Sequence, residues 1–449
     1  MIRRAVRPTL LKPPIPRTGS AVPTGRLARL SRFGGLAAGV AGGMIGEGAR
    51  QLASGKRPAL GDLLLTPGNI VRVTDRLAKL RGAAMKLGQL VSLDSGDLLP
   101  PELTEILARL RADAEPMPAR QLGTVLAGQW GGDWKSKLSA FDANPIAAAS
   151  IGQVHRGRTR DGRPLAIKVQ YPGVAKSIDS DVDNVATLLR LSGLVPKELD
   201  LAPLLAIAKV QLREEADYVR EGACLTRFGD LLAGDPHFHV PDFLPELSTP
   251  TILTMSYAEG VPIESLTDRP QAERDAVAGR MLDLVLRELF DFGLMQTDPN
   301  LANYRYDAAT GKIVLLDFGA TREISPEIAD LYRQMLRAVR DGDRAAALKA
   351  LEAFGLFDDG TTAAHRDEVL ALFDLSAGML LQEGAFDFGD ASWIKSMRGR
   401  GLALASDRTM WRVPPAETLF VQRKLGGSYW LAARLKARVD LHALLDRYL

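Results

Sequence analysis

Two short polar clusters near the middle of the chain carry the side chains best suited to chemistry. The first is Asp298-Pro299-Asn300-Leu301-Ala302-Asn303, and the second is Asp317-Phe318-Gly319, directly after the apolar run 313–316. Carboxylate and amide oxygens are hard ligands that suit Mg²⁺, and a carboxylate can accept a proton from a hydroxyl or a water. Simple turns would also explain Asp and Asn here, but two clusters in this order with a strand between them favour a reactive site.

The spacing of the clusters matches the phosphate-transfer site of protein kinases, which have H-R-D-x-x-x-x-N ahead of D-F-G. Asp298 and Asn303 keep the D-to-N spacing, and Gln296-Thr297 stands in place of His-Arg. We therefore expect Asp317 and Asn303 to bind Mg²⁺ and Asp298 to position the attacking nucleophile. The interval between the two aspartates predicts a hairpin that turns at residues 309–311.

An upstream strand, turn and strand over residues 141–171 would hold the phosphates of a nucleotide. Kinases have G-x-G-x-x-G-x-V and then V-A-I-K here, and Lys168 of Ala166-Ile167-Lys168 is placed to reach the α- and β-phosphates. In the loop only Gly152 remains. Ala147 and Ala149 replace the first two glycines of the kinase motif. They belong to the predicted nucleotide-binding run Ala147, Ala148, Ala149 and Ser150. Alanine lacks the backbone freedom of glycine, so we expect a stiffer loop.

An acidic helix is predicted over residues 203–229, after a helical insertion at about 174–200. A kinase needs one helix glutamate to pair with its strand lysine. Glu221 is the first choice and Glu215 the second, while an exposed charged face is the alternative for any single member. Farther along, the strand 251–255 predicts a hinge at which Ser256, Tyr257 and Ala258 meet an adenine.

The elements after the hinge are predicted to be mostly helical. An amphipathic helix over 275–292 should stop at Gly293. Ser325-Pro326 is a typical helix start, and its closeness to Asp317 leaves no room for a long activation loop. The remainder, 326–449, reads as helical.

Composition places the chain among ordinary globular proteins. It has 449 residues, 46% hydrophobic and 25% charged, with a net charge of +3, so nothing indicates nucleic-acid binding. Its one cysteine, Cys224, excludes an intrachain disulfide framework. The sequence contains no uninterrupted apolar run of about 18 residues, so we expect no membrane-spanning helix.

The N-terminal region differs from the rest in charge. Residues 1–46 contain Lys and Arg but no acidic residue, and the apolar, glycine-rich stretch 33–45 follows the first basic positions. Such a segment could lie on an anionic membrane surface, pack on its own domain, or act as a targeting sequence. We expect residues 1–27 to be disordered. A helix over 70–93 carries Lys86 and Gln89 on one face.

Together these motifs resemble the UbiB family of atypical protein-kinase-like proteins, in the branch that serves coenzyme Q biosynthesis. The markers that carry the resemblance are Lys86-x-Gly88-Gln89, Ala147-Ala148-Ala149-Ser150, Ala166-Ile167-Lys168, Glu215-x-Asp217, Gln296-Thr297-Asp298-Pro299-Asn300 and Asp317-Phe318-Gly319-Ala320.

The resemblance implies an α+β, two-lobed kinase-like fold with an N-terminal helical extension. The expected parts are a basic segment (1–27), the extension with K-x-G-Q (28–125), the N-lobe (126–260) and a helical C-lobe (261–449). It also implies that Lys86 and Gln89 lie over the cleft near Glu215 and Asp217 and exclude protein substrates.

The functional expectation is an Mg²⁺-dependent, ATP-binding kinase or ATPase (ATP/ADP as nucleotide) supporting ubiquinone biosynthesis, without phosphorylation of other proteins. Its expected partners are nucleotide, a membrane lipid or quinone precursor, and coenzyme Q biosynthesis enzymes. We expect it in the cytoplasm, peripheral to the membrane, or on the mitochondrial matrix side in a eukaryote, because the chain ends without a hydrophobic anchor. A small-molecule or lipid kinase and a nucleotide-dependent scaffold are the alternatives.

Overall fold

The computed structural model describes residues 116–191, 202–357, 361–390 and 416–449, with five single positions between 392 and 399. The basic segment, the helix predicted at 70–93 and the Lys86 and Gln89 motif lie outside the described residues. The predicted domain boundaries stay predictions.

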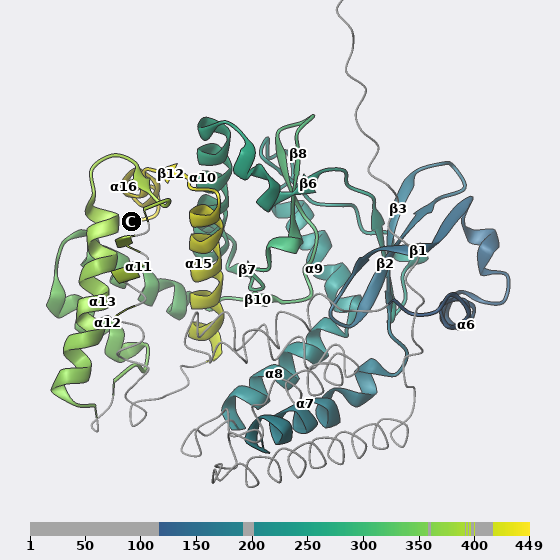
Figure 1. Cartoon of the computed structure of the whole chain (residues 1–449), viewed down its shortest axis with the longest axis horizontal. Coiled ribbons are helices and arrows are strands. Elements are labelled where there is room, and N and C mark those ends of the chain that lie inside the picture. The colour runs from purple at the N-terminus through teal and green to yellow at the C-terminus, as the bar shows by residue number, and fades with distance from the viewer. Residues whose placement is uncertain are drawn as a thin grey trace, which may run out of the picture.

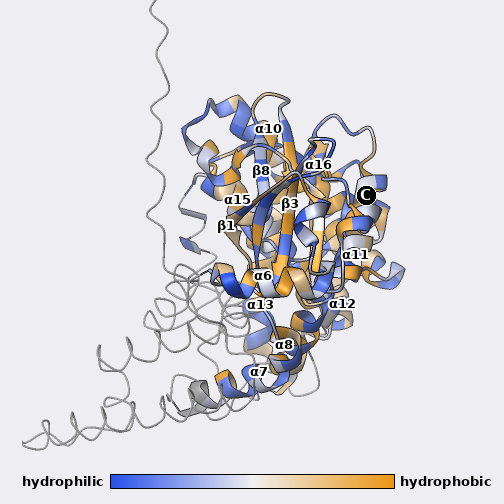
Figure 2. Cartoon of the chain, turned by 90° about the vertical axis from the view of Figure 1, so that its right-hand side faces the viewer, coloured by the Kyte–Doolittle hydropathy of each residue, from blue (hydrophilic) through white to orange (hydrophobic). Residues whose placement is uncertain are grey.

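The smaller lobe is built on an antiparallel sheet of order β1-β2-β3-β5. Its strands are β1 (Ala140–Ala148), β2 (Gly152–Arg158), β3 (Pro164–Gln170) and β5 (Ile252–Ser256). The predicted strand, turn and strand are confirmed, and Gly162 adopts a positive φ of 89° in the turn. Strand β3 is apolar along most of its length (Figure 2), and its side chains Leu165, Ile167 and Val169 are buried in the core.

Three helices follow β3, and one prediction about them is wrong. They are α7 (Val174–Leu191), α8 (Ala202–Glu215) and α9 (Tyr218–Leu231), so the single helix expected over 203–229 is two helices. The break comes at Asp217, whose carboxylate accepts a hydrogen bond from the backbone N–H of Arg220 and caps α9. Helices α7 and α8 pack together below the small sheet, and α9 runs between the lobes (Figure 1).

The larger lobe holds a second sheet, of order β4-β9-β8-β6, and two two-stranded ladders, β7 with β10 and β11 with β12. The sheet strands are β4 (Phe238–His239), β6 (Val261–Pro262), β8 (Tyr304–Asp307) and β9 (Lys312–Leu315). The hairpin predicted at 309–311 is confirmed by the pairing of β8 with β9. Strand β7 (Leu294–Gln296) pairs with β10 (Thr321–Glu323), which brings together the flanks of the two polar clusters.

Helices cover the rest of the larger lobe. Helix α10 (Gln271–Arg287) continues as one π-helical turn and stops, as predicted, at Gly293 in the left-handed conformation. Ser325 caps α11 through its hydroxyl, as its place before Pro326 predicts. The other elements of this part are α11 (Pro326–Arg340), α12 (Arg344–Ala353), α13 (Ala363–Leu381), β11 (Phe386–Asp387), α15 (Ala416–Arg434), β12 (Arg438–Val439) and α16 (Leu441–Leu445). Helix α15 packs against α10 (Figure 1).

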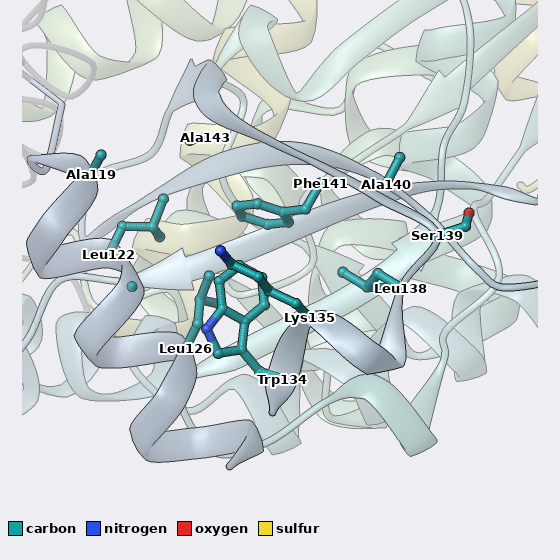
Figure 3. A pocket seen from close by; sticks show the side chains of 11 residues that line it. Ala119, Leu122, Leu126, Trp134, Lys135, Leu138, Ser139, Ala140, Phe141 and Ala143 are labelled. Carbon is teal, nitrogen blue, oxygen red and sulfur yellow. The ribbon is translucent and has the colours of Figure 1, made fainter. Parts of the chain in front are cut away.

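A cavity of about 630 Å³ lies at the outer edge of the small lobe, between α6 (Ala119–Trp130), the short helix 134–137 and β1. Leu122, Leu126, Trp134 and Phe141 line it, with Lys135 beside the rings (Figure 3). None of the residues predicted to carry chemistry lines this cavity. Within the described ranges, no helix combines the length and the apolar character that crossing a bilayer requires.

Candidate active site

The centre of the site is a buried lysine held between two carboxylates from different elements. Strand β3 provides Lys168, whose Nζ lies 2.8 Å from Oε1 of Glu221 on α9. The same Nζ lies 3.3 Å from Oδ2 of Asp317. Of the two helix glutamates considered from the sequence, the structure thus pairs Lys168 with Glu221.

Burial and charge act in opposite directions on this lysine. Burial alone would lower the pKa of Lys168, but the Asp317 and Glu221 carboxylates outweigh it and hold the pKa well above its ordinary value. The ring of Tyr218, fully buried at the start of α9, lies 5.2 Å from Nζ and adds a cation–π contact. Lys168 is therefore a fixed, buried positive charge between Glu221 and Asp317.

Asp317 is more exposed than its lysine partner, with 32% of its side chain accessible. Its Oδ1 accepts a hydrogen bond from the backbone N–H of Gly319 at 3.0 Å. The carbonyl of Gly319 in turn accepts from Arg220 at 2.8 Å, and Arg220 also donates to the carbonyl of Thr321. Sequence reasoning missed Arg220, which ties α9 to the segment after Asp317.

The first polar cluster forms a tight loop beside Asp317. The Nδ2 of Asn303 donates to the backbone carbonyl of Asp298 at 3.2 Å, and both side chains are largely buried. The carbonyl of Asn303 accepts from the N–H of Leu316, one residue before Asp317. The hydroxyl of Thr297 donates to the carbonyl of Ala320 at 2.7 Å. The structure thus brings Asp298, Asn303 and Asp317 together as the spacing predicts.

The alanine-rich run closes the hairpin between β1 and β2. Ala147 and Ala148 pair with β2, and the N–H of Ala149 donates to the carbonyl of Gly152 at 2.9 Å. A Cβ on Gly152 would lie 2.5 Å from the carbonyl oxygen of Val169, so glycine is required there. The hydroxyl of Ser150 donates to Oε2 of Glu215 at 2.9 Å.

Backbone hydrogen bonds within the protein engage two of the three residues predicted to form the hinge. The N–H of Ser256 donates to the carbonyl of Asp242, and the N–H of Tyr257 donates to the carbonyl of Pro164. The Tyr257 ring also stacks under the guanidinium of Arg156 at 4.2 Å. Those two amides are therefore bonded within the protein, and a contact of Ser256, Tyr257 or Ala258 with an adenine stays a prediction.

The acidic residues around the α8–α9 break have four different partners, of which the sequence predicted one, the pairing of Glu221 with Lys168. Glu214 pairs with Arg322 on β10, Glu215 accepts from Ser150, Asp217 caps α9, and Glu221 holds Lys168. Neighbouring residues point to different sides because a helix turns by about 100° per residue. The predicted regulatory contact between Asp217 or Glu215 and Lys86 or Gln89 involves residues outside the described ranges and stays a prediction.

These features define a class. A two-lobed fold with a strand lysine paired to a helix glutamate, and with D-x-x-x-x-N and D-F-G loops at the lobe junction, is a protein-kinase-like fold. The class is atypical because alanine replaces two phosphate-loop glycines and Gln296-Thr297 replaces His-Arg.

Comparisons with known proteins identify the family. Residues 109–351 match the ABC1 atypical kinase-like domain. Atypical kinase COQ8, mitochondrial, of Saccharomyces cerevisiae is 40% identical over 94% of this chain and 84% of that protein. Atypical kinase COQ8B, mitochondrial, of Danio rerio is 39% identical over 95% of this chain and 69% of that protein. The chain belongs to the ABC1 atypical kinases, the UbiB family.

A solved structure shares the fold. The complex of Rv3197 with erythromycin from Mycobacterium tuberculosis is similar to this chain with a TM-score of 0.58 and 25% identity. The similarity covers 83% of this chain and 93% of that one.

Proposed function

We propose that this protein is an Mg²⁺-dependent ATP-binding kinase or ATPase that supports ubiquinone biosynthesis. The observation that carries the proposal is Lys168 held at 2.8 Å from Glu221 and 3.3 Å from Asp317. A cation fixed in this way can bind the α- and β-phosphates of a nucleotide without being reoriented. The pathway assignment is supported by the similarity to mitochondrial COQ8 kinases.

The available oxygen donors fit a magnesium ion. The Nδ2 of Asn303 is bonded to the Asp298 carbonyl, so Oδ1 is the atom of this amide left for a metal. Asp317 is partly exposed and offers a carboxylate. Mg²⁺ takes one or two such ligands together with water and phosphate oxygens. When bound there, it would neutralise charge that develops on the phosphates.

The remaining roles follow from position. Glu221 keeps Lys168 aimed at the cleft, and Asp298 would orient a water or hydroxyl and accept its proton. A water as nucleophile gives ATP hydrolysis, whereas a hydroxyl of a small molecule or lipid gives phosphate transfer. Incubation with γ-labelled ATP and a lipid extract separates the two outcomes, because label appears either in free phosphate or in an extractable product.

An Asp317→Asn variant tests the nucleotide site. At 100 Kd of Mg-ATP, wild-type protein should gain about 2.7 kcal/mol of stability. The variant should lose most of that gain and roughly 10²-fold in ATP turnover, since a transition-state charge contact is removed. Thermal unfolding with and without Mg-ATP gives the first quantity and phosphate release gives the second.

Asp161→Asn, in the exposed β2–β3 turn, is the matched control and should keep the wild-type shift and turnover. An Asp317→Asn variant that gained the full Mg-ATP stabilisation would show that the phosphates bind elsewhere. Normal quinone production in cells that carry this variant would favour a scaffold that needs no catalysis.

A further inference from the structure

A second buried ion pair lies behind the Asp298 loop. Lys424 is on α15, and its side chain is 0% exposed. Its Nζ lies 3.2 Å from Oε2 of Glu288, which is 1% exposed and lies in the π-helical turn after α10. Helix α15 also contacts the loop through its backbone, since a Cβ on Gly427 would lie 2.0 Å from Cβ of Pro299.

Lys424 touches the residue that stands in place of the histidine in H-R-D. Its Nζ lies 3.1 Å from Oε1 of Gln296 and 3.1 Å from the hydroxyl of Tyr304. The Tyr304 hydroxyl lies 3.0 Å from the same Gln296 oxygen. An ammonium group can only donate hydrogen bonds. It therefore fixes which end of the Gln296 amide faces the helix, and the amide nitrogen must face the loop.

That nitrogen acts on the loop directly. Nε2 of Gln296 donates to the carbonyl of Asp298 at 2.9 Å, and Nδ2 of Asn303 donates to the same carbonyl at 3.2 Å. Two side-chain amides thus hold the backbone of Asp298. If Gln296 flipped, its oxygen would face this carbonyl and one of the two bonds would be replaced by repulsion.

Stability alone does not account for a buried ion pair. The cost of removing two charges from water can exceed their attraction, and apolar replacements of both partners are often neutral or stabilising. The presence of the Lys424–Glu288 pair is explained if it fixes a side-chain orientation that apolar side chains could not fix. The chain from Glu288 through Lys424 and Gln296 to Asp298 supplies such a reason.

We propose that Lys424, held by Glu288, is a positioning residue for the Asp298 loop. It orients the Gln296 amide so that Gln296 and Asn303 together hold the Asp298 carbonyl. The inference rests on the proposed function for its catalytic consequence, but its structural consequence can be measured without activity.

The main test replaces both buried charges with methionine, in the variant Lys424→Met/Glu288→Met. The midpoint of thermal unfolding should change little, and the KM for ATP should stay within about twofold, because the nucleotide contacts are intact. The kcat should fall about tenfold, a loss of 1.36 kcal/mol. Amide hydrogens of residues 297–303 should exchange faster than in wild type, while those of α11 should not. Lys209→Met/Asp183→Asn removes an exposed pair between α8 and α7 and should change none of these quantities.

A mutant cycle with Gln296→Met separates positioning from a general effect. If Lys424 acts through Gln296, adding Gln296→Met to the double variant should lower kcat no further, whereas independent effects would multiply. If the Lys424→Met/Glu288→Met variant fails to fold, Tyr304→Phe can replace it in the same cycle. It removes only the hydroxyl that contacts Lys424 and Gln296.

The inference would be overturned if the Lys424→Met/Glu288→Met variant, or the Tyr304→Phe variant used in its place, kept wild-type kcat and wild-type exchange in residues 297–303. Losses in kcat that multiply in the mutant cycle would overturn it as well. Absence of ATP turnover in wild type would instead contradict the proposed function. In that case hydrogen exchange in the loop would still decide whether Lys424 positions it.

Discussion

Ala149 lies in the turn between β1 and β2, at a position where kinases have a glycine of their phosphate-binding loop. Ala147 and Ala148 are exposed, so core packing does not explain why this run is apolar. The ladder already restrains Ala147, while Ala149 is bonded only to Gly152 across the turn. Its methyl group limits the φ and ψ values that the turn can reach. The Ser150–Glu215 hydrogen bond adds a second restraint on the same loop.

An Ala149→Gly variant should loosen this loop and change how it holds phosphates. We expect the ratio of ATP to ADP affinity to change by about tenfold, which is 1.4 kcal/mol, and autophosphorylation to appear. Calorimetric titration of both nucleotides and γ-labelled ATP give the two readouts. Ala143→Gly, in the exposed part of β1, is the control. A folded Ala149→Gly protein with unchanged preference and no autophosphorylation would show that the alanine is not a restraint.

At the residue scale the sequence was informative where spacing alone fixes neighbours. Asp298, Asn303 and Asp317 could be placed together because a short hairpin must return the chain to its start. The partner of Lys168 was predicted as Glu221, with Glu215 as second choice because several carboxylates lie close together on the predicted helix, and the structure confirms Glu221. The roles of Arg220 and Lys424 were not predictable, since each depends on packing between segments about 100 residues or more apart.

Strand β2 contains a buried polar chain that depends on a neutral histidine. The N–H of Met117 donates to Oε1 of Gln153 at 2.7 Å, so the nitrogen of that amide faces Nε2 of His155 at 2.8 Å. Nε2 must then accept, and the protonated Nδ1 donates to the carbonyl of Asp142 at 2.9 Å. Burial lowers the pKa of His155, although its hydrogen bond to Asp142 and the Asp142 charge oppose the shift.

This histidine should make stability depend on pH. Its folded-state pKa lies below the unfolded value of about 6.5, so its contribution is fully present above that pH and is lost as pH falls. Glu221, whose pKa burial raises to about 7, acts in the opposite direction over this range. His155 itself should contribute a decrease in the free energy of unfolding from pH 7 to pH 5, with a slope of at most about 1.4 kcal/mol per pH unit. His155→Phe should reduce that slope.

Denaturant unfolding at several pH values measures the slope. Leu122→Ala, in the same lobe, should lower the free energy of unfolding at every pH without altering its pH dependence. An unchanged slope in His155→Phe would mean that the histidine is not buried in its neutral form.

The elements themselves were predictable where their signals are local. The turn at Asp161-Gly162, the stop at Gly293 and the Ser325 cap all follow from side chains within a few residues of the boundary. The break before α9 was missed because Glu-rich sequence is compatible with a continuous helix. Asp217 lies at the break after α8 and caps α9 through its carboxylate oxygen. In the sequence it cannot be told apart from the other acidic residues of this segment.

At the scale of the whole molecule, the lobes meet along α9 and the two polar loops, while α15 packs against α10 within the larger lobe (Figure 1). Charge is distributed unevenly along the chain. The net charge is only +3, yet the first acidic residue is Glu47, after one lysine and seven arginines. Basic residues close to an anionic surface contribute about 1 kcal/mol each, so this region would supply the electrostatic part of the peripheral membrane contact that the sequence leads us to expect.

Protein that includes residues 1–46 should therefore bind anionic liposomes more tightly than neutral ones, and binding should weaken as salt rises. The Debye length falls from about 10 Å at 0.1 M to 3 Å at 1 M salt. Arg3→Gln/Arg4→Gln/Arg7→Gln should lower the fraction that sediments with anionic vesicles, since three attractive charges are removed. The control, Arg120→Gln/Lys135→Gln/Lys137→Gln, removes the same charge from the small lobe and should sediment as wild type. A greater loss in the control than in the N-terminal variant would place the membrane contact on the α6 face of the small lobe.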